Sequence, residues 1–340
     1  MKIGVFAPAN NAQARDLATA INAVLPGAAC CFGLDLDGAG GAFSLSADRL
    51  IWDGKDCSAL EAAYVYGFGY SDPVVPAARE NVDWSVWQFE YLREQQRYST
   101  VYSALCELPR RGVKMFNPPD AYLNCFMKAY LLEKIRLGGA RVPETVCTNS
   151  LEEAESFAQD REIFWRPATG RAAWQKCLRR QRENLFALDK PPALLAGRIG
   201  AEWRRAYFFE NEILLCLAHE EPVDFPAETL EQFHAIEFDA NMKNDLLQAA
   251  QLAGLAWGMI LFRVEDGKAW IYDFDADPVL DWLPEIFRDN LLHALACSLL
   301  GEKSRKQAPT GIEGKHARPG MFLRRMLRIL FDFEQSKYRS

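Results

Sequence analysis

The chain has 340 residues, 49% of them hydrophobic, and a net charge of −7. This length accommodates two or three domains with hydrophobic cores, and no apolar run is long enough to cross a bilayer. The acidic balance excludes general nucleic-acid binding, because neutralising phosphates requires a basic face. The charge is uneven, since residues 302–340 hold ten Lys or Arg against four Asp or Glu.

The cysteines and histidines show no spacing typical of metal ligands. Nine cysteines include no C-x-x-C, only the adjacent pair Cys30-Cys31, and the four histidines are scattered. Such thiols are usually reduced core residues, so we expect no disulfide framework and no zinc site. The N-terminus, MKIGVFAPANNAQ, begins as a buried strand and lacks a cleavable signal pattern, which predicts a cytoplasmic protein.

Residues 1–115 predict an α/β domain with a parallel sheet. Strands are expected over 2–7, 29–34, 48–52 and 62–67, with an amphipathic helix over 12–24. The turn after the first strand has no G-x-G-x-x-G, which removes the main argument for a dinucleotide site. A long helix follows over 83–108, and we expect its aromatic residues to pack in a core. These residues are Trp84, Trp87, Phe89 and Tyr91.

A third helix is predicted after residue 116. Asn117 or Asp120 can cap its start, and Gly138-Gly139 can end it. Lys134 and Arg136 lie in its last turn, where cations suit the helix dipole. A further helix over 241–255 ends at Gly254, and a final helix or pair of helices is expected over 280–300.

Residues 258–278, GMILFRVEDGKAWIYDFDADP, predict a β-hairpin. Two apolar runs, 259–264 and 269–274, flank a turn that contains Asp266-Gly267. The second strand delivers Asp273, Asp275 and Asp277 at a spacing of two, so all three side chains start on one face. Carboxylates that share a face repel one another unless a cation or basic groups neutralise them.

The end of the chain differs in composition from the body. Residues 301–320 are rich in Lys, Gly and Pro and predict a linker. Residues 321–340 begin MFLRRMLRILFDFE, where Arg residues interrupt apolar ones at helical spacing. This pattern predicts a basic amphipathic helix that docks on a protein partner or on the body of the chain itself; a membrane surface is a weaker alternative.

In order and spacing, several segments resemble the ATP-grasp superfamily. Asn117-Pro118, Lys128, Gly138-Gly139 and Pro143-Glu144-Thr145 match the entry to the fold, and Asp273-Phe274-Asp275 with Pro278 matches its end. The ribosomal-protein glutamate ligases and the graspetide (microviridin-type) peptide ligases are most similar. The resemblance implies an α/β and α+β architecture: a pre-ATP-grasp domain with a parallel sheet over 1–115, then a two-subdomain ATP-grasp domain over 116–300.

The resemblance also implies roles for particular residues. Lys128 would contact an ATP phosphate, and Arg166 and Gly170 belong to the strand and loop that cover the phosphates in that family. Arg204, in Glu202-Trp203-Arg204, would face the phosphates or an acyl-phosphate, in a segment over 194–209 that links the two ATP-binding subdomains. The adenine is held in such folds mostly by backbone groups and apolar side chains.

Two features depart from the family pattern. Only Gly170 remains of the usual glycines in the loop, and a basic helix could supply charge in their place, or could equally be a solvated surface helix. Its residues are Arg171, Lys176, Arg179, Arg180 and Arg182. Asp273 and Asp275 would hold Mg²⁺, but the acid expected on the preceding strand is replaced, by our alignment, by Ile260.

The implied function is ATP-dependent joining of a carboxylate to an amine through an acyl-phosphate. ATP and Mg²⁺ would be the cofactors, with a peptide or an amino acid as substrate. Lys128, Arg166 and Arg204 would stabilise charge on the transferring phosphoryl group. The alternative is a non-catalytic scaffold of the same fold that binds nucleotide or a protein partner without turnover. The sequence leaves open whether the chain forms a homo-oligomer.

Overall fold

The structure is a computed structural model. It describes residues 1–9, 11–36, 41–68, 84–159, 161–170, 173–179, 182, 191–200, 202–219, 233–237 and 239–302. The described residues form two compact units. One comprises Met1–Leu123 with the end of the last helix, and the other comprises Asn124–Ala294. The predicted tail helix at 321–340 and residues 303–320 of the predicted linker lie outside the described residues.

The first unit is built on a four-stranded parallel sheet. Its order is β2-β1-β6-β7, with β1 over Ile3–Ala7, β2 over Ala29–Gly33, β6 over Ala62–Val65 and β7 over Lys114–Phe116. Every residue of β1 is buried, as expected for a central strand of a parallel sheet. Helix α1, over Ala12–Val24, packs against β1 and β2 and begins where the Asn11 side chain accepts a hydrogen bond from the Ala14 N–H. The predicted α/β class with a parallel sheet is confirmed, but the strand predicted over 48–52 is not part of that sheet, and β7 was not predicted.

A small antiparallel sheet flanks this unit. It contains β3 (Ser44–Leu45), β4 (Leu50–Trp52) and β5 (Lys55–Asp56), followed by a 3-10 turn, η1, over Cys57–Ala59. Trp52 is completely buried and meets the Phe6 ring edge-on at 4.9 Å between centroids. This contact ties the small sheet to the core strand β1.

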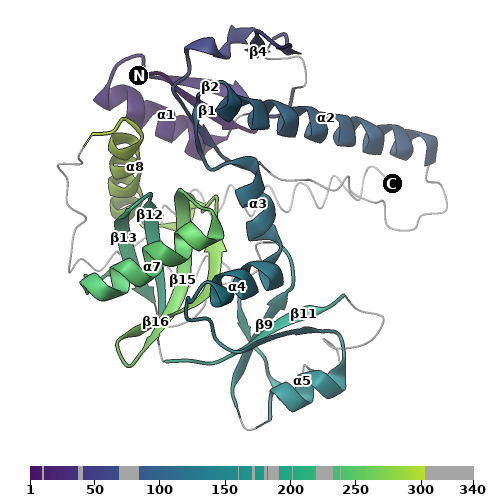
Figure 1. The fold of residues 1–340 in the computed structure, drawn as a ribbon, viewed down its shortest axis with the longest axis vertical. Helices are drawn as coiled ribbons and strands as arrows, with labels where there is room; N and C mark the ends of the chain where they lie inside the picture. Colours follow the sequence, from purple (N-terminus) through teal and green to yellow (C-terminus); the bar gives the residue numbers. More distant parts are fainter. Residues whose placement is uncertain are drawn as a thin grey trace. The chain divides into compact units, whose positions relative to one another are not determined.

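Helix α2 runs from Trp84 to Arg110, and its aromatic residues are not core residues as predicted (Figure 1). Trp84 is 63% exposed and Phe89 is 65% exposed. Only the C-terminal half of the helix buries apolar residues, such as Leu105 and Leu108 against the sheet. In the N-terminal half the Trp87 ring instead contacts the rings of Trp84 and Tyr91 along the helix surface.

The helix predicted after residue 116 is divided in two. Helix α3 covers Pro119–Phe126, helix α4 covers Lys128–Leu137, and Met127 separates them. Helix α4 ends at Gly138, as expected from the sequence. The interruption makes Lys128 the first residue of α4.

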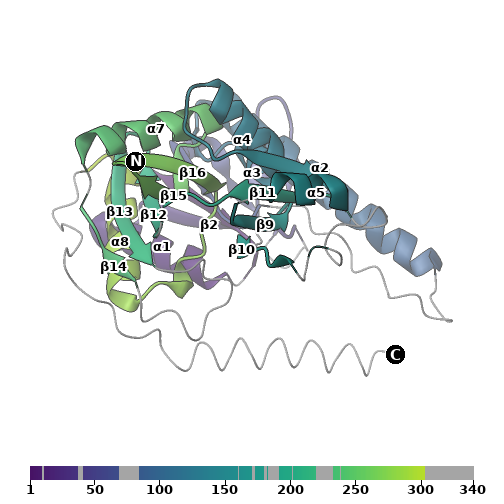
Figure 2. The ribbon, with the colours of Figure 1, turned by 90° about the horizontal axis from the view of Figure 1, so that it is seen from below.

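The second unit contains two antiparallel sheets (Figures 1 and 2). The smaller has the order β10-β9-β11-β8 and packs on helix α5 (Leu151–Phe157) through a core that includes Phe157, Ile163 and Leu195. Its strands are β8 (Thr145–Thr148), β9 (Ile163–Pro167), β10 (Gln175–Lys176) and β11 (Ala193–Gly197). The sequence predicted a basic helix that includes Lys176. This residue lies in strand β10 instead, so the prediction of a helix at this position is wrong.

The larger sheet has the order β14-β13-β12-β15-β16. Its strands are β12 (Trp203–Phe209), β13 (Glu212–His219), β14 (His234–Ala235), β15 (Trp257–Glu265) and β16 (Lys268–Asp275). Helix α7, over Ala240–Ala253, lies against β13 and β16 and ends at Gly254 in the left-handed conformation. A 3-10 turn, η4 (Leu280–Trp282), and helix α8 (Glu285–Leu299) complete the described chain.

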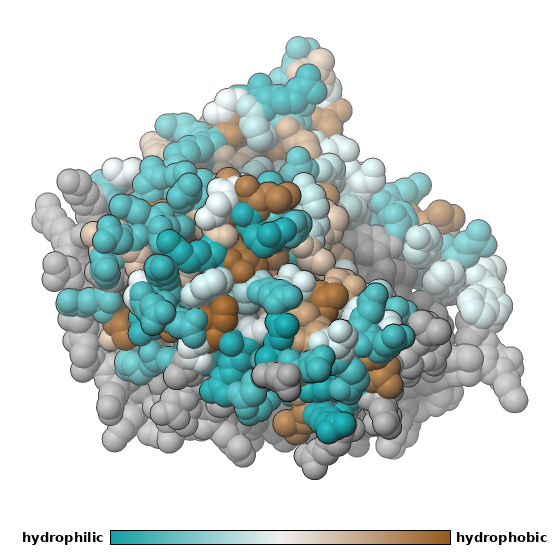
Figure 3. Space-filling view, turned by 60° about the horizontal axis from the view of Figure 1, so that its bottom comes forward, coloured by the Kyte–Doolittle hydropathy of each residue, from teal (hydrophilic) through white to brown (hydrophobic). Residues whose placement is uncertain are grey.

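No described helix is long and apolar enough to cross a membrane. On the face drawn in Figure 3, hydrophobic residues are scattered among hydrophilic ones rather than gathered in one continuous patch.

Candidate functional site

The predicted hairpin is present as strands β15 and β16. They are joined by Asp266 and Gly267, both with positive φ (52° and 70°), as a tight two-residue hairpin turn requires. Residues that lie directly opposite each other on antiparallel strands share a face of the sheet. Asp273 lies opposite Leu261, and Asp275 lies opposite Met259.

This register corrects the position of the missing acid. Ile260 lies opposite Phe274, so it points to the face of the sheet opposite to Asp273 and Asp275. The positions beside the two aspartates on β15 are Met259 and Leu261, and both are apolar. Within the described ranges, no group of three or more acidic, Cys or His side chains could hold a metal ion.

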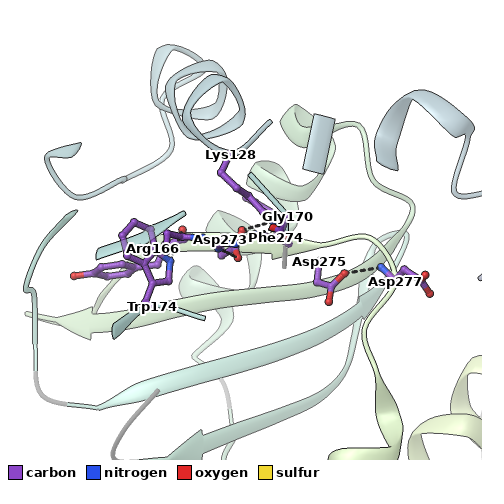
Figure 4. A network of polar contacts seen from close by, with 9 residues as sticks. Lys128, Arg166, Gly170, Trp174, Asp273, Phe274, Asp275 and Asp277 are labelled. Atoms are coloured by element: carbon purple, nitrogen blue, oxygen red, sulfur yellow. Dashed lines mark hydrogen bonds and ion pairs between the residues drawn. The ribbon is translucent and has the colours of Figure 1, made fainter. Parts of the chain in front are cut away.

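Asp273 is the centre of a buried ion-pair network (Figure 4). Lys128 Nζ, at the start of α4, lies 2.7 Å from Asp273 Oδ1 and 2.7 Å from the Phe274 carbonyl oxygen. Arg166, on β9, donates to the other carboxylate oxygen of Asp273 and to the Gly170 carbonyl oxygen at 2.8 Å. The fold thus brings together four of the predicted site residues, which come from three separate elements.

The network is dry. Lys128 is 3% exposed and Arg166 is 1% exposed, so each cation depends on the single carboxylate between them. Burial by itself raises the pKa of Asp273, but the charges of Arg166 and Lys128 outweigh it and hold that pKa below its usual value. Nearby, burial raises the pKa of the Cys125 thiol to about 12.

Asp275 and Asp277 lie apart from this network (Figure 4). Asp275 is the last residue of β16, and its Oδ1 accepts a hydrogen bond of 3.0 Å from the Asp277 N–H. Asp277 lies beyond the end of the strand and is completely buried. The three aspartates therefore do not form one row of exposed carboxylates.

The arrangement does not fit the predicted magnesium site. Both oxygens of Asp273 already accept from cations, and a metal ion bound there would lie beside the charges of Lys128 and Arg166. Mg²⁺ is usually held by one or two carboxylates that are free to coordinate it. Binding of Mg²⁺ by Asp273 would require this network to open.

Arg204, on strand β12, does not lie on the same face of the sheet as Asp273. Arg204 lies opposite Phe262, on the face that points away from Asp273, and its guanidinium pairs with Glu202 at 3.2 Å. Arg205 lies opposite Leu261, which in turn lies opposite Asp273. Arg205 is therefore the arginine of β12 that shares a face with Asp273, and the alternation of side chains along a strand is the signal that identifies it.

An aromatic cluster next to Asp273 was not expected from the sequence. The pairing of β15 and β16 shifts at Leu261/Phe262, where Asp273 and Ile271 are paired and Tyr272 is the extra residue of a bulge. The Tyr272 ring lies 4.7 Å from that of Trp203, 5.8 Å from that of Trp174 and 6.2 Å from that of Phe164. All four side chains are buried.

The Tyr272 hydroxyl binds the backbone of the segment that joins β11 to β12. It donates to the Gly197 carbonyl oxygen at 2.6 Å and accepts from the Ile199 N–H at 3.0 Å. Trp174 contacts the backbone of the same tyrosine, because its Nε1 donates to the Tyr272 carbonyl oxygen at 3.2 Å. The guanidinium of Arg263 lies over the Trp203 ring at 4.7 Å.

A cavity of about 550 Å³ borders the same backbone segment on another side. Gly197 and Ile199 contribute to its wall, together with the ion pairs Arg161–Glu144 and Arg198–Glu162. Hydrogen bonds from Lys176 and Arg198 lower the pKa of Glu162 to about 2. None of Lys128, Arg166 and Asp273 lines this cavity, so it is distinct from the ion-pair network.

Comparison with solved structures identifies the fold of the chain. No family model matches the chain, and no curated protein matches it. Among solved structures, the ATP-grasp ligase PsnB with a minimal precursor is 18% identical, with a TM-score of 0.73 over 88% of this chain and 99% of that one. Other PsnB structures hold AMPPNP with the precursor peptide PsnA2, or Mg and ADP with a minimal precursor.

Two further ligases are similar over most of their length. The macrocyclase MdnC of Microcystis aeruginosa MRC, bound to the precursor peptide MdnA, is 16% identical, with a TM-score of 0.68 over 88% of this chain and 99% of that one. A RiPP-associated ATP-grasp ligase of Chryseobacterium gregarium is 14% identical, with a TM-score of 0.67 over 92% and 100%. The likeness shows that the chain has the ATP-grasp fold, as the sequence predicted.

Proposed function

We propose that this chain, which has the fold of the ATP-grasp ligases, uses ATP to join a carboxylate to an amine on a peptide. The observation that carries the proposal is the convergence of Lys128 and Arg166, from α4 and β9, on the strand that ends the hairpin. Two buried cations from separate elements make a site for a polyanion such as a triphosphate once their carboxylate partner moves. Similarity to ligases solved with precursor peptides supports a peptide as the substrate.

The reaction has two steps that balance without a protein nucleophile. A substrate carboxylate oxygen attacks the γ-phosphorus of ATP, and ADP leaves. The amine nitrogen then attacks the acyl carbon and loses a proton, and phosphate departs as the new amide bond forms. In this chain Lys128 and Arg166 would neutralise the phosphates, and Arg205 would take the role that the sequence predicted for Arg204.

A ligase of this kind normally uses Mg²⁺, for which the sequence predicts Asp273 and Asp275 as ligands. Because Asp273 pairs with both cations here, we derive no step through the metal.

Adjacent arginines on β12 give a matched test of the proposal. Arg205→Ala removes a cation from the face of Asp273, whereas Arg204→Ala removes one from the opposite face. At saturating ATP, with a peptide that offers both carboxylate and amine, we expect Arg205→Ala to lower ADP formation by about 10²-fold or more. Arg204→Ala should stay within about twofold of the wild type.

One outcome would contradict the role of Arg205, and another would contradict the ligase function. Equal activity of the two variants would remove Arg205 from the site. ATP binding without ADP formation in the wild type, over a panel of peptides, would instead support the alternative of a non-catalytic scaffold. Calorimetric titration with ATP, with and without Mg²⁺, separates binding from turnover.

A further inference from the structure

The segment between β11 and β12 presents two backbone groups to one side chain. The Gly197 carbonyl oxygen is an acceptor, the Ile199 N–H is a donor, and both are bonded by the Tyr272 hydroxyl. A hydroxyl can do this because it donates one hydrogen bond and accepts others. The amino edge of adenine has the same character, since its exocyclic amine donates while the neighbouring ring nitrogen accepts.

The space around the Tyr272 ring also suits a purine. Phe164, Trp174 and Trp203 surround it with aromatic surface, and all are at most 4% exposed. A flat, apolar slot that ends in a few polar backbone groups is the usual form of a site for a heteroaromatic ligand. In this structure the slot is filled by the chain's own tyrosine.

The next residue along the strand occupies the other half of the site. Asp273 supplies the negative charge that Lys128 and Arg166 require, because two buried cations without an anion would be costly. Tyr272 thus bonds the two backbone groups of Gly197 and Ile199, which could bind adenine. Asp273 neutralises Lys128 and Arg166, which could bind phosphates. The bulge at Tyr272 makes this possible, since it lets consecutive residues serve the two halves.

We propose that Tyr272 and Asp273 form an internal substitute for the nucleotide, and that ATP binds only when the Tyr272 side chain leaves the slot between Gly197 and Ile199. This inference rests on the proposed function, because it assigns a closed state to the same nucleotide site. The substitute stabilises the protein without nucleotide. It also weakens ATP binding by the free energy needed to open the slot.

Three variants test the substitute, with adenosine and ATP as probes in calorimetric titrations. Tyr272→Leu removes the hydroxyl and the outer part of the ring, and Tyr272→Phe removes the hydroxyl alone. Tyr130→Leu is the matched control, because Tyr130 is 55% exposed and lies outside the cluster. Thermal unfolding of each variant checks that the fold is intact.

We expect Tyr272→Leu to bind adenosine and ATP about tenfold more tightly than the wild type, or better, because it frees two hydrogen-bonding groups and the slot. Tyr272→Phe should fall between the wild type and Tyr272→Leu, and Tyr130→Leu should match the wild type. Should Tyr272→Leu not fold, the comparison of Tyr272→Phe with the wild type decides the question, since only the hydroxyl differs. An affinity for adenosine that is equal in Tyr272→Phe and the wild type would then overturn the proposal.

The outcomes separate this inference from the proposed function. Equal ATP affinity in the wild type and Tyr272→Leu would overturn the internal substitute and leave the ligase function standing. Tighter binding by Tyr272→Leu with no ADP formed by any variant would support the substitute and overturn the ligase function. Binding of neither probe by any of the proteins would overturn both.

Discussion

At the scale of single residues, Asp273 is the carboxylate on which the candidate site is centred. Its two oxygens are shared between Lys128 and Arg166, which are separated from it by 145 and 107 residues in the chain. A buried pair adds little when it replaces apolar packing, but removing one partner leaves a charge without compensation. Asp273 therefore has a structural role in this state besides its proposed role in the reaction.

The first residue-scale prediction concerns stability. Asp273→Asn leaves Lys128 and Arg166 buried without a counter-charge, so we expect a loss of about 3–5 kcal/mol in the free energy of unfolding at pH 7. Asp245→Asn is the control, because the Asp245 carboxylate pairs with Arg141 at the exposed surface, where an ion pair contributes little. Urea unfolding measures both, and an equal loss in the two variants would contradict the assignment.

A second prediction follows from the lowered pKa of Asp273. The carboxyl titrates near its ordinary value of 3.8 in the unfolded chain and lower in the folded one, so the unfolded state takes up the proton first as the pH falls. The stabilisation by this carboxylate is fully present above 3.8 and is lost as the pH drops through the folded pKa. The difference in unfolding free energy between wild type and Asp273→Asn should be constant near neutral pH and shrink below pH 3.8. A difference that grows on acidification would have the wrong sign.

At the scale of elements, the larger sheet of the second unit sorts side chains by strand alternation. Arg204 and Arg205 are neighbours in sequence, yet one pairs with Glu202 while the other shares a face with Asp273. The same alternation moves the missing acid from Ile260 to the apolar positions Met259 and Leu261. One step along a strand therefore changes which residues share a face with Asp273.

Glycine in the segment between β11 and β12 provides an element-scale prediction. Gly200 has a φ of +60°, and a Cβ there would lie 2.3 Å from the Val264 carbonyl oxygen. Gly267, in the hairpin turn, has a similar φ of +70°, but nothing lies within 4 Å of its Cβ position. Gly267→Ala should cost about 1–2 kcal/mol for the left-handed backbone alone, and Gly200→Ala more, because the steric clash adds to it. Chemical unfolding compares them, and equal losses would mean that the segment moves away freely.

At the scale of the whole molecule, each described unit has a core of its own. In the first unit a parallel sheet packs against α1. In the second unit two antiparallel sheets pack with α5 and α7. The proposed chemistry lies in the second unit, where Lys128, Arg166 and Asp273 meet. Helix α2 belongs to the first unit and exposes Trp84 and Phe89, a feature that the proposed chemistry does not use.

The fold and most of its elements could be predicted from the amino-acid sequence alone. Local patterns were enough for the hairpin of β15 and β16, the turn at Asp266-Gly267 and the end of α4 at Gly138, because each depends on residues that are close in the chain. The order of the matching segments then predicted the ATP-grasp fold. The same matches predict Lys128, Arg166 and Asp273 as site residues.

The contacts that these residues make depend on long-range packing and could not be predicted from the sequence. That Asp273 pairs with two cations, that Arg205 and not Arg204 faces it, and that Tyr272 reaches Gly197 depend on strand register and on a bulge. These are contacts between residues far apart in sequence, and a shift of one residue in pairing would reverse them. The exposure of Trp84 and Phe89 was missed for the same reason, because a helix pattern cannot tell how far the sheet beneath it extends.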